Sequence, residues 1–241
     1  MFIGHYAAGF ALKAVERKAS LGVLFLAAQF VDILYFILVP LGIERLNMVE
    51  NYTAVNHMEL LYYPYSHSLL AAFFWGMIAY GLWRFFPWFK RERRHSVAVV
   101  VGLAVLSHWF IDFLDHDGVT TIFDACTIVD SAASIEGLLL GDDGVKVGFG
   151  LWNNFSLTVV GEISLLLAAV FYYVKRTKPK GKWGGTAIWI FTLLMVGVYL
   201  MTVMAPFDPA ITPDIASYGG LVLYFLFGAA AFWVDRFRNG A

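Results

Sequence analysis

Two histidines and an aspartate recur at intervals of four residues in a largely apolar part of the chain. His108, Asp112 and His116 fall on one stripe of a helix, because side chains at positions i, i+4 and i+8 share a face. An imidazole and a carboxylate one turn apart can bind the same cation, or one of them can orient the other. The apolar runs Val97–Leu106 and Trp109–Ile111 flank His108 and Asp112, so burying these two groups unpaired would cost several kcal/mol. The motif therefore indicates a buried polar site.

Other ionisable residues lie at a similar depth in different apolar segments: His5, Asp32 and Glu162. At about 1.5 Å of rise per helical residue, these three and the pair His108 and Asp112 lie about 18–24 Å from the basic ends of their helices. His67 falls nearer the opposite end of its segment. Ionisable residues inside a membrane are costly and mark a functional site by default. We therefore expect these side chains to meet.

Three kinds of site use such residues. His108 and Asp112 can simply pair with each other or cap neighbouring backbone, and acids and histidines can relay protons or ions in a transporter. A metal centre is the interpretation we favour; zinc suits mixed nitrogen and oxygen ligands best, and manganese or iron also fit. The single cysteine, Cys126, excludes an intrachain disulfide framework and a cysteine-based zinc cluster.

The composition indicates which elements must position this site. Of the 241 residues, 60% are hydrophobic and only 15% are charged, whereas soluble domains are roughly 25% charged. So few charges cannot cover a soluble globule with polar surface. A net charge of −1 also argues against a general nucleic-acid-binding protein. The chain is therefore expected to be a membrane protein whose partners are lipids.

Six segments reach the length of about 20 apolar residues that a membrane-crossing helix needs. They cover approximately residues 21–43, 65–86, 97–114, 151–174, 186–206 and 215–234. We expect an all-α polytopic transmembrane bundle that forms a single integral membrane domain over residues 1–241. Small side chains in residues 1–18, where the charges lie only at the C-terminal end, favour a half-helix packed inside the bundle over one lying flat on the membrane.

Basic residues predict the orientation of the bundle. With six spans, 15 of the 17 Lys and Arg residues fall on one side, and only Arg45 and Lys146 fall on the other. Because cytoplasmic loops carry the excess of Lys and Arg, both termini are predicted to be cytoplasmic. The loop at 115–150 then lies on the outer side, where we expect it to act as a lid.

Several short motifs carry a resemblance to a known family. They are Gly4-His5-Tyr6-Ala7, Gln29-Phe30-Val31-Asp32, Tyr63-Pro64-Tyr65-Ser66-His67-Ser68, Ser107-His108-Trp109 with Asp112, and Gly148-Phe149-Gly150-Leu151-Trp152-Asn153. Together they resemble the YdjM-like membrane-bound metal-dependent hydrolases of the bacterial inner membrane. The resemblance runs from His5 to about Glu162, and the last two spans match only in being apolar.

This resemblance implies metal-assisted hydrolysis of a lipid or a lipid-linked ester or phosphoester. Its pattern maps onto His5, Asp32, His67, His108 and Asp112 as ligands of a divalent metal, and we add His116 as a sixth. Glu162 is then the general base or proton donor, and Asn153 and Tyr65 stabilise negative charge on the substrate. A transporter or permease that relays protons, and an accessory subunit of a larger membrane complex, are the alternatives.

Overall fold

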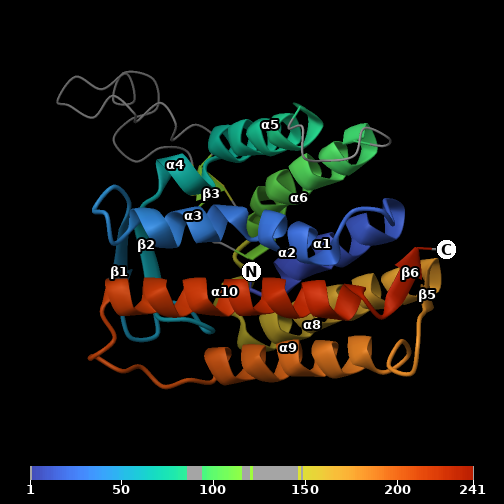
Figure 1. Ribbon diagram of the computed structural model, residues 1–241. Helices are drawn as coiled ribbons and strands as arrows, with labels where there is room; N and C mark the ends of the chain where they lie inside the picture. The colour runs from blue at the N-terminus through green and yellow to red at the C-terminus, as the bar shows by residue number, and fades with distance from the viewer. Residues whose placement is uncertain (1, 86–93, 116–119, 122–145, 148, 241) are drawn as a thin grey trace.

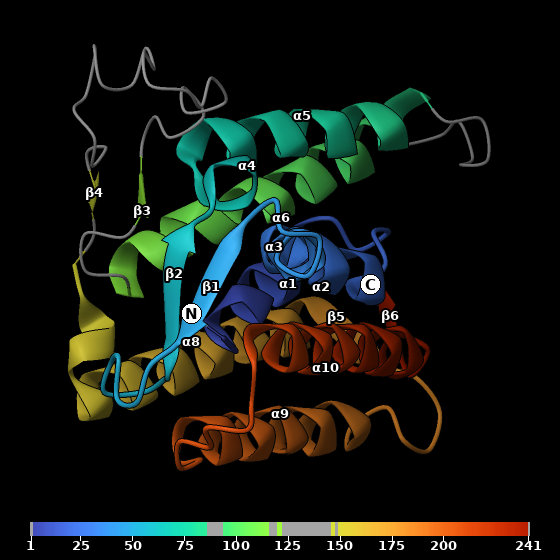
Figure 2. The same ribbon diagram turned by 90° about the vertical axis from the view of Figure 1, so that its left-hand side faces the viewer.

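The computed structural model describes residues 2–85, 94–115, 120–121, 146–147 and 149–240. Most of them form helices stacked in layers (Figure 1). From one outer face to the other, the layers are α5 (Leu69–Phe85) with α6 (Arg94–Asp115), then α1 (Gly4–Val15) with α2 (Leu21–Ala28) and α3 (Phe30–Leu38), then α8 (Phe155–Arg176) with α10 (Pro213–Asp235), and finally α9 (Ala187–Val203). The view along the bundle shows the same order (Figure 2).

Several of these helices can cross a membrane. In the part of the chain that the structure describes, α6, α8 and α10 are long and apolar enough to do so, and α2 with α3 is a fourth if the bent pair is one span. The apolar helices α5 and α9 have 17 residues each and are shorter. The expected helical bundle is thus confirmed, with three or four helices of membrane-spanning length among the described residues, whereas six spans remain a prediction.

Two of the expected spans are broken, which corrects the prediction that they are continuous. The span at 21–43 bends by 51° at Gln29, between α2 and α3. The span at 65–86 is divided into α4 (Pro64–His67) and α5 by Ser68, which is extended. Ser68 Oγ accepts a hydrogen bond from the backbone N–H of Ala71, so this residue acts as the N-cap that starts α5. Both breaks lie next to residues of the predicted site, Asp32 and His67.

A β-hairpin occupies part of the loop between the first two expected spans. Strand β1 (Arg45–Met48) pairs antiparallel with β2 (Met58–Tyr62) at one end of the bundle (Figure 2). Its apolar side chains pack on a cluster that includes Tyr35, Phe36 and Tyr224. The hairpin was not predicted, because strands this short have too little alternation to be distinguished from a loop. Strands β3 (Thr120–Thr121) with β4 (Lys146–Val147), and β5 (Thr177–Pro179) with β6 (Arg238–Gly240), form two smaller pairs.

The N-terminal segment forms α1, as predicted for residues 1–18, and lies inside the bundle. Its side chains Ile3, Tyr6 and Phe10 are fully buried in the largest hydrophobic cluster, together with residues of α2, α8, α9 and α10. On this same side of the central layer, α10 comes close to α2 and α3. A Cβ atom at Gly22 or Gly220 would collide with Phe232 or Phe36, so these glycines permit the close approach.

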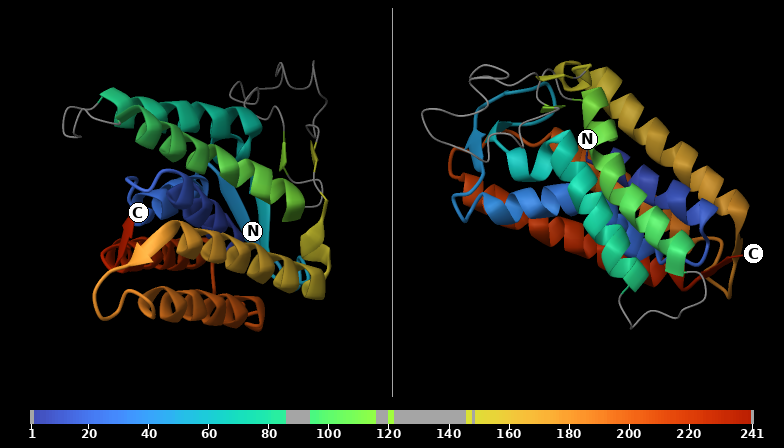
Figure 3. Two further views of the ribbon diagram at one scale, coloured as in Figure 1. Left: turned by 90° about the vertical axis from the view of Figure 1, so that its right-hand side faces the viewer. Right: turned by 90° about the horizontal axis from the view of Figure 1, so that it is seen from above.

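The basic segments lie together at one end of the bundle. There Lys13 Nζ contacts Asp235 Oδ1 at 2.9 Å, which joins α1 to the end of α10. The buried guanidinium of Arg238 donates hydrogen bonds to the carbonyl oxygens of Val174, Thr177 and Gly184, which ties the C-terminal strand to the end of α8. Figure 3 shows this end beside the C-terminus, with the hairpin at the other end. The basic ends of α1, α8 and α10, which are predicted to share one side of the membrane, therefore share one end of the fold.

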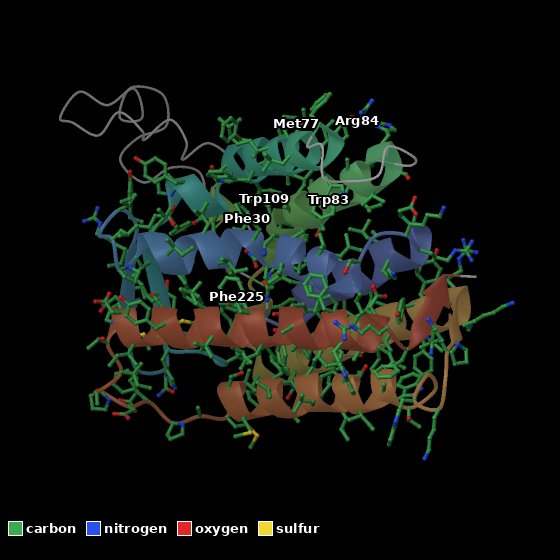
Figure 4. The ribbon with its side chains drawn as sticks, in the orientation of Figure 1. Phe30, Met77, Trp83, Arg84, Trp109 and Phe225 are labelled. Carbon is green, nitrogen blue, oxygen red and sulfur yellow. The ribbon has the colours of Figure 1, made fainter. Side chains whose placement is uncertain are left out.

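Helix α5, in the outer layer, has one side facing away from the bundle and one side facing α6. Met77 and Arg84 lie on the side of α5 that faces away from the bundle, whereas Trp83 lies on the inner side, toward α6 (Figure 4). Met77 is exposed, and Trp83 packs on the cluster formed by α2 and α6. Most of the predicted outer loop at 115–150 lies outside the described residues, so its expected role as a lid stays a prediction.

Candidate metal centre

Five of the predicted site residues meet at the centre of the fold. His5 comes from α1, Asp32 from the first turn of α3, His67 from the end of α4, and His108 and Asp112 from α6. All five are largely or fully buried, and the Asp32 side chain is the most accessible at 18%, against 3% for Asp112. Residues more than one hundred positions apart in the chain thus form one cluster.

The distances between nitrogen and carboxylate atoms are those of a compact ligand set. His5 Nε2 lies 3.0 Å from Asp112 Oδ1, and His67 Nε2 lies 3.1 Å from Asp32 Oδ1. His108 Nε2 lies between both acids, 3.1 Å from Asp112 Oδ2 and 3.4 Å from Asp32 Oδ1. Two groups have ligand atoms within 4.8 Å of one another: His5, Asp32 and His108, and His67, His108 and Asp112. His108 belongs to both groups and lies at the centre.

The tautomer of His108 follows from the helix break at Gln29. His108 Nδ1 lies 2.8 Å from the carbonyl oxygen of Ala28, the last residue of α2. A carbonyl can only accept, so Nδ1 carries the hydrogen and a neutral His108 has its lone pair on Nε2. The bend at Gln29 presents this carbonyl to the imidazole. The break in the first span therefore fixes the orientation of the central ligand.

A buried chain of hydrogen bonds orients His67 in the same way. Ser66 Oγ donates to Glu44 Oε2 at 2.7 Å and lies 2.7 Å from His67 Nδ1. The Ser66 hydrogen is used on Glu44, so His67 Nδ1–H donates to Ser66 and a neutral His67 directs the lone pair of Nε2 toward Asp32. Glu44 Oε1 also accepts from the backbone N–H groups of Tyr65 and Ser66. Burial raises the pKa of the Glu44 carboxyl, while these hydrogen bonds lower it.

This arrangement places the lone pair of the central imidazole against negatively charged oxygens. Among the described residues, neither His5 Nε2 nor His108 Nε2 forms a hydrogen bond, although each lies within 3.1 Å of an Asp112 oxygen. Two electron-rich atoms at this distance repel each other unless a proton or a metal cation lies between them. A divalent cation supplies that charge and neutralises the two aspartates. The residues present therefore suit a metal ion of borderline character.

Further contacts orient the side chains of the candidate centre. Tyr224 OH, on α10, donates to Asp32 Oδ2 at 3.0 Å. The His5 ring stacks on the His108 ring, with centroids 3.7 Å apart and planes 6° from parallel. Glu162 Oε2 accepts from the backbone N–H groups of Phe2 and Gly4, at 2.9 and 3.1 Å. Glu162 thus caps the start of α1 and holds His5 in place.

A cavity of about 440 Å³ lies next to this cluster. Asp32, His67 and Asp112 line one part of it, and Glu162 and Tyr224 also reach it. Most of the remaining lining is apolar and comes from the hairpin, α3, α9 and α10. Its size falls within the range of about 300–1,000 Å³ that is usual for small-ligand pockets. The candidate metal centre is therefore accessible from a mainly apolar cavity.

The other predicted residues have different positions. Glu162 lines the cavity, as a general base must. Tyr65 is half-buried beside the cluster, and Asn153 is exposed in the short 3₁₀ helix Leu151–Asn153. Neither residue lines the cavity, so their expected contact with a substrate stays a prediction. His116 lies outside the described residues, and its role as a ligand stays a prediction.

Sequence reasoning missed three residues that support the ligands. Glu44 follows the first expected span directly, yet it is 1% exposed. Ser66 was noted only as a neighbour of His67, and Tyr224 was read as an ordinary residue of an apolar span. A carboxylate directly after the first span and a serine preceding a buried histidine were the available signals. Their pairing depends on the turn after α3, which the sequence alone does not reveal.

Comparison with known proteins identifies no relative. No family model matches the chain, and no curated protein and no solved structure matches it either. The resemblance to YdjM-like hydrolases therefore rests on the sequence motifs alone.

Proposed function

We propose that this protein is a membrane-embedded hydrolase that depends on a divalent metal. His5, Asp32, His67, His108 and Asp112 are the proposed ligands. The observation that carries the proposal is the geometry of His108, whose Nδ1–H is donated to Ala28 while Nε2 faces two carboxylates without a hydrogen bond. A metal-ligating histidine commonly donates its other ring N–H to a backbone carbonyl.

The ligand types favour zinc, with manganese or iron as the other candidates. Three imidazoles and two carboxylates form a mixed set of nitrogen and oxygen donors, without sulfur among the five. Imidazole suits zinc and iron, and carboxylates suit manganese. When bound, such a cation lowers the pKa of a coordinated water toward neutrality and polarises the bond to be cleaved.

The protein groups would divide the remaining tasks. Asp32 is the most accessible ligand and borders the cavity, so substrate would meet the centre beside it. Tyr224 holds Asp32 Oδ2 and thereby fixes which carboxylate oxygen faces His67 and His108. Glu162 is the one acid outside the ligand set that lines the cavity among the described residues, and we assign it the role of proton acceptor.

The apolar cavity favours a lipid, or a lipid-linked ester or phosphoester, as substrate. A water-soluble substrate would gain little from a lining composed mainly of aromatic and aliphatic side chains. We further propose that the protein resides in a bacterial inner membrane, which the resemblance to YdjM-like hydrolases implies, with both termini in the cytoplasm, which the distribution of basic residues indicates. Bulk membrane lipids would then be both its solvent and its source of substrate.

The test is hydrolysis by purified protein reconstituted in phospholipid vesicles. The substrates would be a fluorogenic long-chain carboxylic ester and a fluorogenic phosphodiester with a lipid tail. We expect cleavage of one of them that is lost on treatment with a chelator and restored by zinc or manganese, but absent in Asp112→Ala. Cleavage that persists after verified metal removal would overturn the proposal. So would chelator-insensitive uptake of a solute down its gradient without cleavage of either substrate, which would favour a transporter.

A further inference from the structure

The cavity has a second wall, formed by α9 and α10, that differs from the wall at the metal centre. On α10 the lining residues Ala216, Gly219, Gly220 and Leu223 follow a spacing of three or four residues, so they form one face of the helix. On α9 Tyr199 and Thr202 do the same. Two helix faces, one of them made largely of small residues, therefore face the same space.

The cavity reaches the molecular surface between these two helices. Thr202 on α9 and Gly219 on α10 line the cavity and are also exposed. A Cβ atom added at Gly219 would meet no other atom within 4 Å. Open space therefore extends from the interior to the outside at this point, and a larger side chain at position 219 would occupy it.

The surface around this opening is apolar. Several large hydrophobic residues on the two helices and at the end of α9 are exposed here: Met201, Met204, Ile215, Tyr218 and Val222. An exposed apolar surface of this kind on a membrane-crossing helix such as α10 faces lipid chains rather than water. The opening thus connects the cavity with the interior of the bilayer.

A polar group without a partner lies on the hairpin side of the cavity. Asn56 Oδ1 accepts a hydrogen bond from the backbone N–H of Met58, which determines the orientation of the side-chain amide. Its Nδ2 is buried and forms no hydrogen bond within the described part of the chain. The next residue, His57, lies with Nε2 3.2 Å from the carbonyl oxygen of Ala205, which fastens this loop to the end of α9. Because Asn56 also lines the cavity, a small shift of its side chain would let this N–H donate to an oxygen of a ligand there.

We propose that a phospholipid-like amphiphile enters the cavity sideways from the bilayer, between α9 and α10. Its acyl chain lies along the faces that contain Thr202 and Gly219, and its ester or phosphate oxygen accepts a hydrogen bond from Asn56 Nδ2. The inference rests on the proposed function, because it gives the substrate of that metal centre its class and its route. It requires no water-filled path to the buried ligands.

The experiment is photo-crosslinking of the full chain in phosphatidylcholine vesicles that contain a trace of phosphatidylcholine with a diazirine on its acyl chain. Peptide mass spectrometry would locate the adducts. Any lipid-facing residue, such as Leu193, will be labelled. Tyr199 and Tyr224 are buried cavity residues, and we expect adducts on them as well. Adducts confined to outward-facing residues would overturn the proposed route.

Two variants locate the entry point. Gly219→Phe should abolish the adducts on Tyr199 and Tyr224 while leaving those on Leu193 unchanged. Gly197→Phe is the matched control, because Gly197 lies on α9, does not line the cavity, and likewise has no atom within 4 Å of an added Cβ. If Gly219→Phe folds poorly, Thr202→Phe can replace it and should have the same effect on the adducts. Equal labelling of the two tyrosines in both glycine variants would contradict an entry between α9 and α10.

A metal-site variant separates this inference from the proposed function. His108→Ala should retain the adducts on Tyr199 and Tyr224, because His108 does not line the cavity and the route does not involve the metal. Adducts on both tyrosines that depend on Gly219, without any metal-dependent cleavage, would support the route and refute the hydrolase. Metal-dependent cleavage with adducts on outward-facing residues alone would support the hydrolase and refute the route.

Discussion

Ser66 donates a hydrogen bond to Glu44 at 2.7 Å, and both residues are almost completely buried. The bond links α4 to the turn after α3. Because Ser66 also accepts from His67, it connects a residue outside the spanning helices with a ligand of the candidate metal centre. Glu44 is thus a positioning residue that acts on the centre without contacting it.

Replacing Ser66 by alanine should weaken metal binding without preventing folding. His67 would lose the acceptor for its Nδ1–H, and loss of such a partner reduces metal affinity about 10–100-fold. Ser68→Ala is a suitable control, because Ser68 Oγ bonds only to Pro64 and Ala71 among the described residues. Metal titration by calorimetry would measure both variants. Equal affinities in the two would show that the Glu44–Ser66 chain does not act on the centre.

Removing the hydroxyl group of Tyr224 should slow the proposed hydrolysis. Tyr224→Phe keeps the ring but leaves Asp32 Oδ2 without the donor at 3.0 Å, so the carboxylate gains freedom to rotate. We expect a decrease in kcat of about tenfold or more, in line with the effect of lost outer-shell partners. Tyr218→Phe alters an exposed tyrosine on the same helix and should have no effect. A wild-type rate in Tyr224→Phe would argue against Asp32 as an oriented ligand.

Two substitutions at Glu162 separate its structural and chemical roles. Glutamine retains an oxygen that accepts from Phe2 and Gly4, so Glu162→Gln should fold and bind metal normally. Its hydrolytic rate should fall by about 10²–10⁴-fold if Glu162 accepts the proton. Glu162→Ala also removes the cap of α1 and should destabilise the protein by about 1–3 kcal/mol. Full activity of Glu162→Gln would refute the catalytic role of Glu162, and its role would then be only to cap α1.

The ion pair at the basic end should matter for stability but not for metal binding. Lys13 and Asp235 have 8% and 17% exposed side chains, and Lys13 Nζ also donates to the carbonyl oxygens of Arg17 and Ala19. Removing one partner of such a buried pair costs about 3–5 kcal/mol. Lys13→Ala should therefore lower the free energy of unfolding in detergent, whereas Lys18→Ala, at an exposed position, should not. A loss below about 1 kcal/mol would place this pair with ordinary surface ion pairs.

The sequence was sufficient to predict that the candidate ligands lie close together. Asp32, His108 and Asp112 are charged or polar residues in apolar helices, and their cost of burial selects them without any knowledge of contacts. The depth calculation then placed His5 beside them, and the structure confirms that α1 lies inside the bundle. Helical periodicity and a constant rise per residue explain this success, because both are properties of single helices.

The breaks at Gln29 and Ser68 could not be predicted in the same way. Gln29 interrupts an apolar run whose composition suits a continuous helix, whereas Ser68 follows the polar residues Ser66 and His67 near the start of the expected span at 65–86. At Gln29 the carbonyl of Ala28 accepts from His108, a residue eighty positions away, so the bend depends on tertiary contacts. The cavity wall of α10 was missed for a related reason. Gly219 and Gly220 resemble ordinary small residues of a membrane helix until the position of α9 is known.

The most direct test of the central claim is the metal content of the purified protein. Mass spectrometry of metals in the intact protein, isolated without chelator, should find about one equivalent or more of zinc, manganese or iron per chain. The variant His108→Ala/Asp112→Ala should contain almost none, while Ser68→Ala should match the wild type. A wild-type protein without stoichiometric metal, which also fails to bind any of the three when they are added, would contradict the metal centre.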